Sequence, residues 1–147
     1  MQGLIFDVDG TISIDNQLIN GTVDFFAKLD KRGIPYVFVS NTTSRTPARM
    51  MERLNSQGLH LNEDQIITPI TTAKQYLKDN GYRKIALVRC EATEVEFSEF
   101  EFSDDPEVVI LTDDGEGLTY DDVNRCFNYH LKGAKITALQ KNKYYAR

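Results

Sequence analysis

The sequence lacks the features that mark two large classes of protein. No apolar run approaches the roughly 20 residues that a helix needs to cross a bilayer, so we expect a soluble chain with no membrane partner. The N-terminal residues carry no basic stretch followed by an apolar one, which a secretory signal requires. We therefore expect a cytoplasmic protein.

Cysteine is scarce, and positive charge is not in excess. The only two cysteines, Cys90 and Cys126, stand far apart without the spacing of a zinc site or a disulfide framework, so both are expected to be ordinary buried thiols. The net charge is -5 and the pI is about 5.0. Nucleic-acid binders normally carry a basic surface, so nucleic acid is not an expected partner.

The first half of the 147 residues alternates short apolar runs with helical patterns. Strands are predicted at 3–6, 36–39 and 64–68. Helices are predicted from Thr22 to the basic turn before Gly33, from Pro47 to Gly58, and from Thr71 or Thr72 to Asn80. This alternation predicts an α/β fold with a doubly wound parallel sheet, here called the core and assigned to residues 1–81.

The character of the sequence changes after Arg83. Strands are predicted at 84–88, 108–111 and 135–139, and a helix at 120–132. The segment from Glu91 to Asp105 holds seven acidic residues interleaved with aromatic ones. That alternation favours a half-buried strand with a solvated acidic face over a metal site. We assign residues 82–147 to a separate cap region.

Polar residues follow the first two predicted strands. Asp7 and Asp9 end the first strand, and Ser40 ends the second. Ligands of open α/β sheets collect at the carboxyl ends of parallel strands, so these side chains can meet at one site. Asp7 is a candidate nucleophile toward phosphorus. Two close carboxylates repel each other, which favours a protonated Asp9 that acts as general acid and then as base.

The neighbouring residues suit a phosphate group. Gly10 allows the backbone to turn closely around an anion, and Thr11 donates a hydrogen bond. Ser40 offers a hydroxyl, while the amides of Asn41 and Thr42 point toward the same edge. A phosphate dianion facing carboxylates also requires Mg²⁺, which binds oxygen ligands.

Two motifs carry a specific resemblance. Asp-x-Asp-Gly-Thr at residues 7–11 and Val-Ser-Asn-Thr-Thr at 39–43 resemble motifs I and II of the haloacid dehalogenase superfamily. The later segments 66–69, 106–110, 119–120 and 133–136 resemble its NagD-like members, which carry a C2-type cap. Residues 141–145 are similar to the branch of the phospholysine phosphohistidine inorganic pyrophosphate phosphatases. Only one crossover helix fits between the two motifs, so the cap must follow the third strand.

The resemblance implies a Rossmann-like core and a phosphohydrolase that acts on small phosphorylated metabolites through an aspartyl phosphate. It implies that Asp7 and Asp9 bind Mg²⁺, Asp9 through its carbonyl, and that Ser40 and Asn41 bind phosphate. Arg45 is a candidate for contact with substrate or with a capping acid, and equally a surface residue. Motif III lysine and motif IV acids have no matching positions, so the core is expected to be incomplete in its C-terminal half.

Several alternatives stay open. Thr112, Asp113 and Asp114 imitate motif IV, although cap elements in order around them favour a turn within the cap. A chain without motifs III and IV is alternatively a catalytically defective relative that binds phosphate or a protein partner. Exposed aromatic residues in the cap make a homo-oligomer possible. Surface or structural roles are expected for the remaining candidates, Lys84, Lys141, Lys143, His60 and His130.

Overall fold

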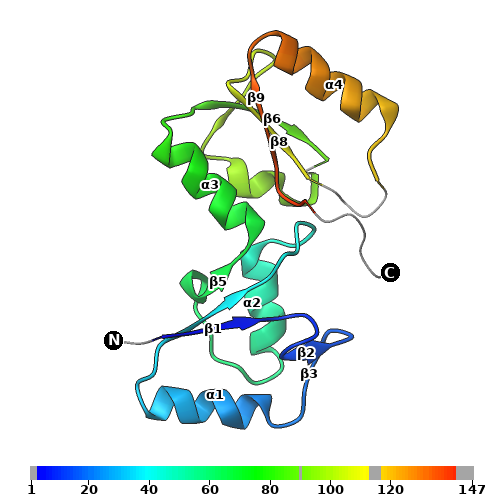
Figure 1. The fold of residues 1–147 in the computed structure, drawn as a ribbon. Coiled ribbons are helices and arrows are strands. Elements are labelled where there is room, and N and C mark those ends of the chain that lie inside the picture. Colours follow the sequence, from blue (N-terminus) through cyan, green and yellow to red (C-terminus); the bar gives the residue numbers. More distant parts are fainter. Residues whose placement is uncertain (1–2, 90, 113–116, 142–147) are drawn as a thin grey trace. The chain divides into compact units, whose positions relative to one another are not determined.

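The computed structural model describes residues 3–89, 91–112 and 117–141, drawn in colour in Figure 1. These residues form two compact units. The first unit comprises the chain up to Asn41 together with Pro47–Thr68. The second comprises Thr42–Thr46 and the chain from Pro69 onward. Among the described residues, no helix combines the length and the apolar character that a membrane span requires.

The sheet of the first unit has three parallel strands in the order β1-β4-β5. β1 spans Leu4–Asp7, β4 spans Tyr36–Val39 and β5 spans Ile66–Ile67. All three predicted strands therefore form and are parallel. The third is shorter than predicted, because Glu63–Gln65 forms the 3-10 helix η1, whose capping box pairs Asn62 with Gln65.

The helices α1 (Thr22–Lys31) and α2 (Pro47–Asn55) cover one face of this sheet. Their buried side chains share a single cluster with the inward residues of the strands: Phe26, Leu29, Met50 and Leu54 from the helices, and Tyr36, Phe38 and Ile66 from the strands. Strand residues alternate between faces, so the opposite face carries Ile5, Val39 and Ile67. These three are exposed, Ile5 to 73%. Only one face of this parallel sheet is covered by described residues.

A small hairpin lies between β1 and α1. Its strands are β2 (Ser13–Ile14) and β3 (Gln17–Leu18), which pair antiparallel. The two turn residues, Asp15 and Asn16, have φ values of 48° and 64°. Asp and Asn tolerate this left-handed conformation and favour such two-residue turns. The hairpin was not predicted from the sequence.

The sheet of the second unit has four parallel strands in the order β7-β6-β8-β9. They span Glu101–Phe102 (β7), Lys84–Val88 (β6), Val108–Leu111 (β8) and Lys135–Ala138 (β9). One face packs against α3 (Pro69–Asp79) and the 3-10 helix η2 (Glu91–Phe97). The other packs against α4 (Tyr120–Leu131) through Cys126. Figure 1 shows the helices on either side of the sheet.

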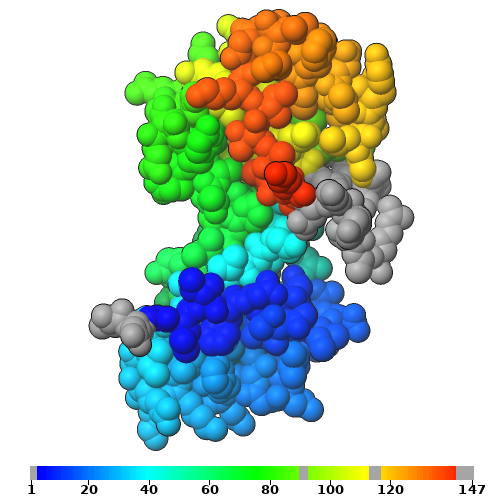
Figure 2. Space-filling model, viewed as in Figure 1, coloured from blue at the N-terminus to red at the C-terminus, as the bar shows by residue number. Residues whose placement is uncertain are grey.

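The outer side of α4 is open to solvent, as its orange surface in Figure 2 shows. Apolar side chains recur along this side at helical spacing and are exposed: Tyr120, Val123, Phe127 and Leu131. The helix begins at Thr119, whose hydroxyl accepts a hydrogen bond from the Asp122 amide in a capping box. Cys126 is buried, as predicted, whereas Cys90 lies outside the described residues.

Two expectations differ from the structure. α3 begins at Pro69 rather than at Thr71 or Thr72, because Thr68 and Pro69 open it as Thr46 and Pro47 open α2. Residues 91–97 form a 3-10 helix, not a strand. The buried residues of α3 pack against β6 and β8, so the second compact unit takes in α3. The assignment of residues 1–81 to a core domain and of 82–147 to a cap stays a prediction.

Candidate active site

The carboxyl ends of the strands of the first unit meet at one edge. Asp7, the last residue of β1, lies opposite Val39, the last residue of β4, and Val39 lies opposite Ile67 of β5. Ser40 follows directly; it is buried, and its amide donates a hydrogen bond of 3.0 Å to the carbonyl of Ile67. The parallel register therefore brings Asp7 and the segment Ser40–Asn41 to the same edge of the sheet.

The loop after β1 is folded tightly around Val8. This residue is fully buried, and its carbonyl accepts hydrogen bonds from the amides of Thr11, Ile12 and Ser13 at 3.3, 3.0 and 3.0 Å. Gly10 has a φ of 85°, which favours glycine, and its amide donates to the carbonyl of Ser13 at 2.7 Å. The turn leaves the Asp7 and Asp9 residues exposed on the surface of the loop.

Each of the two aspartates has its own partners. The Thr11 hydroxyl donates a hydrogen bond of 3.1 Å to Asp7 Oδ2. The Ser13 hydroxyl lies 3.4 Å from Asp9 Oδ1, and Arg53 Nη2 lies 3.7 Å from the same oxygen. The contact between Arg53 and Asp9 is an ion pair, since its length exceeds that of a hydrogen bond.

Sequence reasoning missed Arg53. It lies on α2 directly before the buried Leu54, a position that gives no signal of a contact with the loop after β1. The first unit brings together most of the predicted site residues at one edge: Asp7, Asp9, Gly10, Thr11, Ser40 and Asn41. Thr42 and Arg45 belong to the second compact unit, and their role at a phosphate stays a prediction.

The donor atoms at this edge suit a hard cation. The Asp7 carboxylate and the Asp9 backbone carbonyl offer oxygen atoms, the ligands that Mg²⁺ prefers, and Mg²⁺ commonly keeps several waters and takes only one or two protein carboxylates. Within the described ranges, no group of three or more His, Cys, Asp or Glu side chains could hold a metal. The residues present thus fit Mg²⁺ bound by two aspartates and water.

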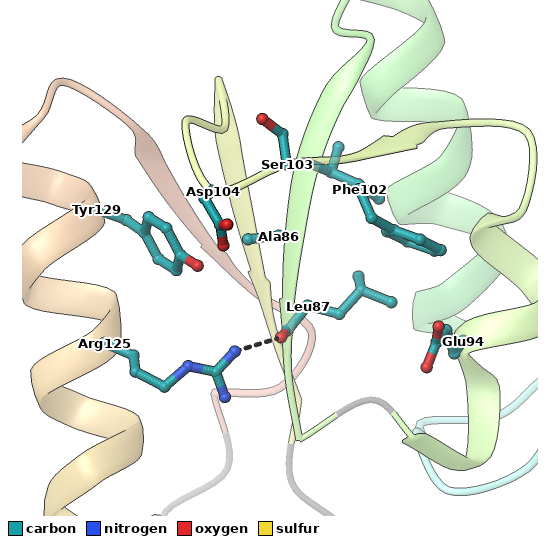
Figure 3. Close-up of a pocket in the computed structure, with 9 residues that line it drawn as sticks. Ala86, Leu87, Glu94, Phe102, Ser103, Asp104, Arg125 and Tyr129 are labelled. Atoms are coloured by element: carbon teal, nitrogen blue, oxygen red, sulfur yellow. Dashed lines mark hydrogen bonds between the residues drawn. The ribbon is translucent and has the colours of Figure 1, made fainter.

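The second unit has a separate, shallow pocket of about 310 Å³. Figure 3 shows Arg125 and Tyr129 of α4 on one side of it and Phe102 of β7 on the other, with Ala86 and Leu87 of β6 between them. Arg125 Nη2 donates a hydrogen bond of 3.5 Å to the carbonyl of Leu87. None of the residues that line this pocket is a predicted site residue.

The carboxyl edge of the second sheet is organised by an ion pair. Arg89 follows β6 with a φ of 61°, and its Nε donates to Asp122 Oδ2 at 2.9 Å. Hydrogen bonds from the Thr119 hydroxyl and amide, together with Arg89, lower the pKa of Asp122 to about 2. These contacts tie β6 to the start of α4.

The other candidates from the sequence take ordinary positions. Lys84 is exposed, although β6 is an interior strand, and His130 Nδ1 lies 3.2 Å from the carbonyl of Ala134. His60 and Lys141 are exposed. Asp113, Asp114 and Lys143 lie outside the described residues.

Comparison with known proteins identifies relatives along the whole chain. Over 147 residues it is 28% identical to haloacid dehalogenase-like hydrolase domain-containing protein 2 of Mus musculus, covering 100% of this chain and 56% of the relative. It is 26% identical to phospholysine phosphohistidine inorganic pyrophosphate phosphatase of Rattus norvegicus, covering 99% of this chain and 55% of that protein. The chain thus spans about half the length of the curated relatives it matches.

Solved structures share the fold. NagD from E. coli K-12 superimposes with a TM-score of 0.81 at 22% identity, covering 93% of this chain and 56% of NagD. The p-nitrophenyl phosphatase from Archaeoglobus fulgidus gives a TM-score of 0.83 at 24% identity, covering 97% and 56%. These matches confirm the predicted α/β fold of the NagD-like type.

The similarity to the family extends well beyond the two motifs. The model of the haloacid dehalogenase-like hydrolases matches residues 4–103, which include the loop after β1 and the segment after β4. The chain belongs to the haloacid dehalogenase-like hydrolase family.

Proposed function

We propose that the protein is a Mg²⁺-dependent phosphohydrolase that acts on small phosphorylated metabolites through an aspartyl-phosphate intermediate. The observation that carries the proposal is the position of Asp7, which ends β1 with its Oδ2 bound by Thr11 and with Ser40 leaving the adjacent strand. Membership of the hydrolase family and the relatives whose names contain phosphatase support the same reaction.

In the first step, an Asp7 carboxylate oxygen attacks phosphorus and the bond to the ester oxygen breaks. The Thr11 hydroxyl engages Oδ2, which supports Oδ1 as the proposed attacking atom. Asp9 gives its proton to the departing oxygen. In the second step, Asp9 takes a proton from the water that attacks phosphorus, and phosphate leaves with Asp7 regenerated.

Charge at the phosphoryl group requires stabilisation from several sides. Asp7 and Asp9 would hold Mg²⁺, whose charge would offset the repulsion between the substrate dianion and the two aspartates. The Ser40 hydroxyl and the amides near Gly10 and Asn41 are the proposed donors to the nonbridging oxygens. Thr42 and Arg45 are proposed to contact the substrate from the segment after motif II.

The net charge and the exposed apolar residues of the protein support two proposals about its binding partners. A net charge of -5 supports a small phosphorylated substrate rather than a nucleic acid. The exposed apolar side chains along α4 support the proposed homo-oligomer. Light scattering coupled to gel filtration tests this: a single mass equal to the monomer over a wide concentration range would argue against self-association.

The proposed reaction is tested with 4-nitrophenyl phosphate in the presence of Mg²⁺. Asp7→Asn is expected to reduce kcat about 10³-fold or more, because the amide is not a nucleophile. Asp24→Asn, which makes the same change in charge on the exposed face of α1, is the control and should retain activity. Circular dichroism establishes that both variants are folded.

Two outcomes would overturn the proposal. Hydrolysis that persists in Asp7→Asn would exclude Asp7 as the nucleophile. Binding of inorganic phosphate without any turnover would support the alternative of a catalytically defective relative.

A further inference from the structure

Two side chains, Arg53 on α2 and Gln57 after it, hold the hairpin β2–β3 against this helix. Arg53 Nη1 donates a hydrogen bond of 3.2 Å to Asn16 Oδ1. Gln57, just beyond the end of α2, donates from Nε2 to the Asn16 carbonyl at 3.0 Å and accepts from the Leu18 amide at 2.7 Å. These three hydrogen bonds join residues that are 37 to 41 positions apart in the sequence. They are tertiary contacts, and they hold the hairpin against the helix.

Arg53 differs from Gln57 in one respect. Besides the hairpin, its guanidinium reaches the loop after β1, where Nη2 forms the ion pair with Asp9 Oδ1 at 3.7 Å. The Arg53 side chain is only 17% exposed, whereas that of Asp9 is 53% exposed. Holding a cation in a mostly buried position costs free energy unless a carboxylate and hydrogen-bond acceptors compensate it. Hairpin fastening alone does not require a charge, since Gln57 achieves it without one.

Both contacts of the Asp9 carboxylate fall on the same oxygen. Ser13, which is itself buried, and Arg53 approach Oδ1, and the described residues form no hydrogen bond or ion pair with Oδ2. An exposed aspartate would otherwise sample several rotamers. Two partners on Oδ1 restrict the side chain to one orientation and leave Oδ2 open.

We propose that Arg53 is a positioning residue that orients the Asp9 carboxylate so that Oδ2 faces the departing oxygen of the substrate. This inference rests on the proposed function, in which Asp9 carries the proton. Arg53 touches neither substrate nor the reacting atoms and acts through Asp9. The planar guanidinium bridges Asn16 and Asp9 with separate nitrogens, which a lysine ammonium reproduces only in part.

The test exploits the dependence of general acid catalysis on the leaving group. A poor leaving group such as phenolate needs the proton, while 4-nitrophenolate departs without it. A misplaced Asp9 therefore slows hydrolysis of phenyl phosphate more than that of 4-nitrophenyl phosphate. A general loss of folding or of hairpin order slows both substrates equally.

Three variants separate the roles. Arg53→Met removes the charge at similar length. It is expected to lower kcat/KM for phenyl phosphate about tenfold or more, a part of the 10²–10⁴ that a general acid supplies, with at most about a threefold loss for 4-nitrophenyl phosphate. The comparison uses kcat/KM, because this constant reports the steps up to departure of the leaving group and not the later hydrolysis of the aspartyl phosphate, which both substrates share. KM should change little for either substrate. Arg53→Lys should recover part of the loss with phenyl phosphate. Gln57→Met, the matched control, loses the hydrogen bonds to the hairpin and one to the Arg53 carbonyl but leaves the Arg53 guanidinium and its charge, and should show no preference between substrates.

A double variant tests whether Arg53 acts through Asp9. In an Asp9→Asn background, Arg53→Met should have no further selective effect on phenyl phosphate, because the group that it orients is already absent. Additive losses would overturn the inference. If Arg53→Met does not fold, Arg53→Lys carries the same test, with a smaller loss confined to phenyl phosphate.

The outcomes separate this inference from the proposed function. Absence of hydrolysis of both phosphates by the wild-type protein refutes the proposed function and the inference with it. Hydrolysis by the wild-type protein with equal losses for both substrates in Arg53→Met, or with the selective loss also in Gln57→Met, overturns the role of Arg53 alone.

Discussion

Asp7 and Val39 are direct neighbours across the parallel pair β1–β4, and each is the last residue of its strand. The chain leaves the sheet at the same level in both strands. The loop that holds Asp9 and Thr11 and the segment that begins with Ser40 therefore start side by side. A one-residue shift in register would move the two segments apart and turn one set of side chains to the other face.

Thr11→Val tests the hydrogen bond to Asp7. The variant keeps the shape of the side chain but removes the donor that engages Oδ2 at 3.1 Å. A hydrogen bond to a charged group contributes about 1.5–3 kcal/mol, so kcat for 4-nitrophenyl phosphate should fall about tenfold or more. Thr11→Ser keeps the hydroxyl and should remain near wild type. Equal activity in both variants would show that the contact does not affect the nucleophile.

Removal of Mg²⁺ tests the proposed cofactor. Chelation should abolish hydrolysis of 4-nitrophenyl phosphate, and added Mg²⁺ should restore it, because two uncompensated carboxylates repel the substrate dianion. Calorimetry should also show weaker Mg²⁺ binding in Asp7→Asn than in Asp24→Asn, which leaves the edge of the sheet unchanged. Activity that is insensitive to chelation would exclude the metal.

Much of the fold follows from local sequence signals. The run Tyr36–Val39 and the Thr46-Pro47 start of α2 predict a strand and a helix that the structure contains. Prediction failed where one sequence pattern is compatible with two kinds of secondary structure. The alternation of Val95, Phe97 and Phe100 suits a strand, but η2 buries Phe97 on the sheet and leaves Val95 exposed. The hairpin strands are too short, at two residues each, to give a periodic signal.

The candidate site likewise has residues that the sequence predicts and one contact that it does not. The order of strand and polar residue along the chain is enough to predict that Asp7 and Ser40 lie at one edge, because parallel strands share a carboxyl end. The contact of Arg53 with Asp9 could not be predicted. It depends on how α2 packs on the sheet and on the hairpin that brings Asn16 beside the guanidinium. Such contacts arise from tertiary packing and leave no motif in the chain.

Phe26→Ala should destabilise the first unit strongly. Phe26 is 2% exposed, and its ring packs against those of Phe6, Tyr36 and Phe38 at centroid distances of 5.0, 4.8 and 4.9 Å. Loss of a buried aromatic ring costs about 3–5 kcal/mol of the free energy of unfolding.

The neighbouring residue supplies the matched control for this change. The Phe25 ring lies at the edge of the same cluster, 5.3 Å from that of Phe26, but it is 45% exposed, so Phe25→Ala should cost only about 1 kcal/mol. Denaturation in urea, followed by circular dichroism, measures both variants. Similar losses would mean that the aromatic cluster does not dominate the packing of this unit.

Acid should weaken the second unit through Asp122. Its pKa is lowered to about 2 in the folded state by Thr119 and Arg89, from about 3.9 in an unfolded chain. A depressed pKa means that the stabilisation is fully present above pH 4 and is lost as the pH falls from about 4 to about 2. The melting temperature of the wild-type protein should therefore fall more steeply across this window than that of Asp122→Asn. Asp121→Asn, which leaves the capping box intact, should follow the wild type. Parallel curves for wild type and Asp122→Asn would show that the contacts of this carboxylate do not stabilise the fold.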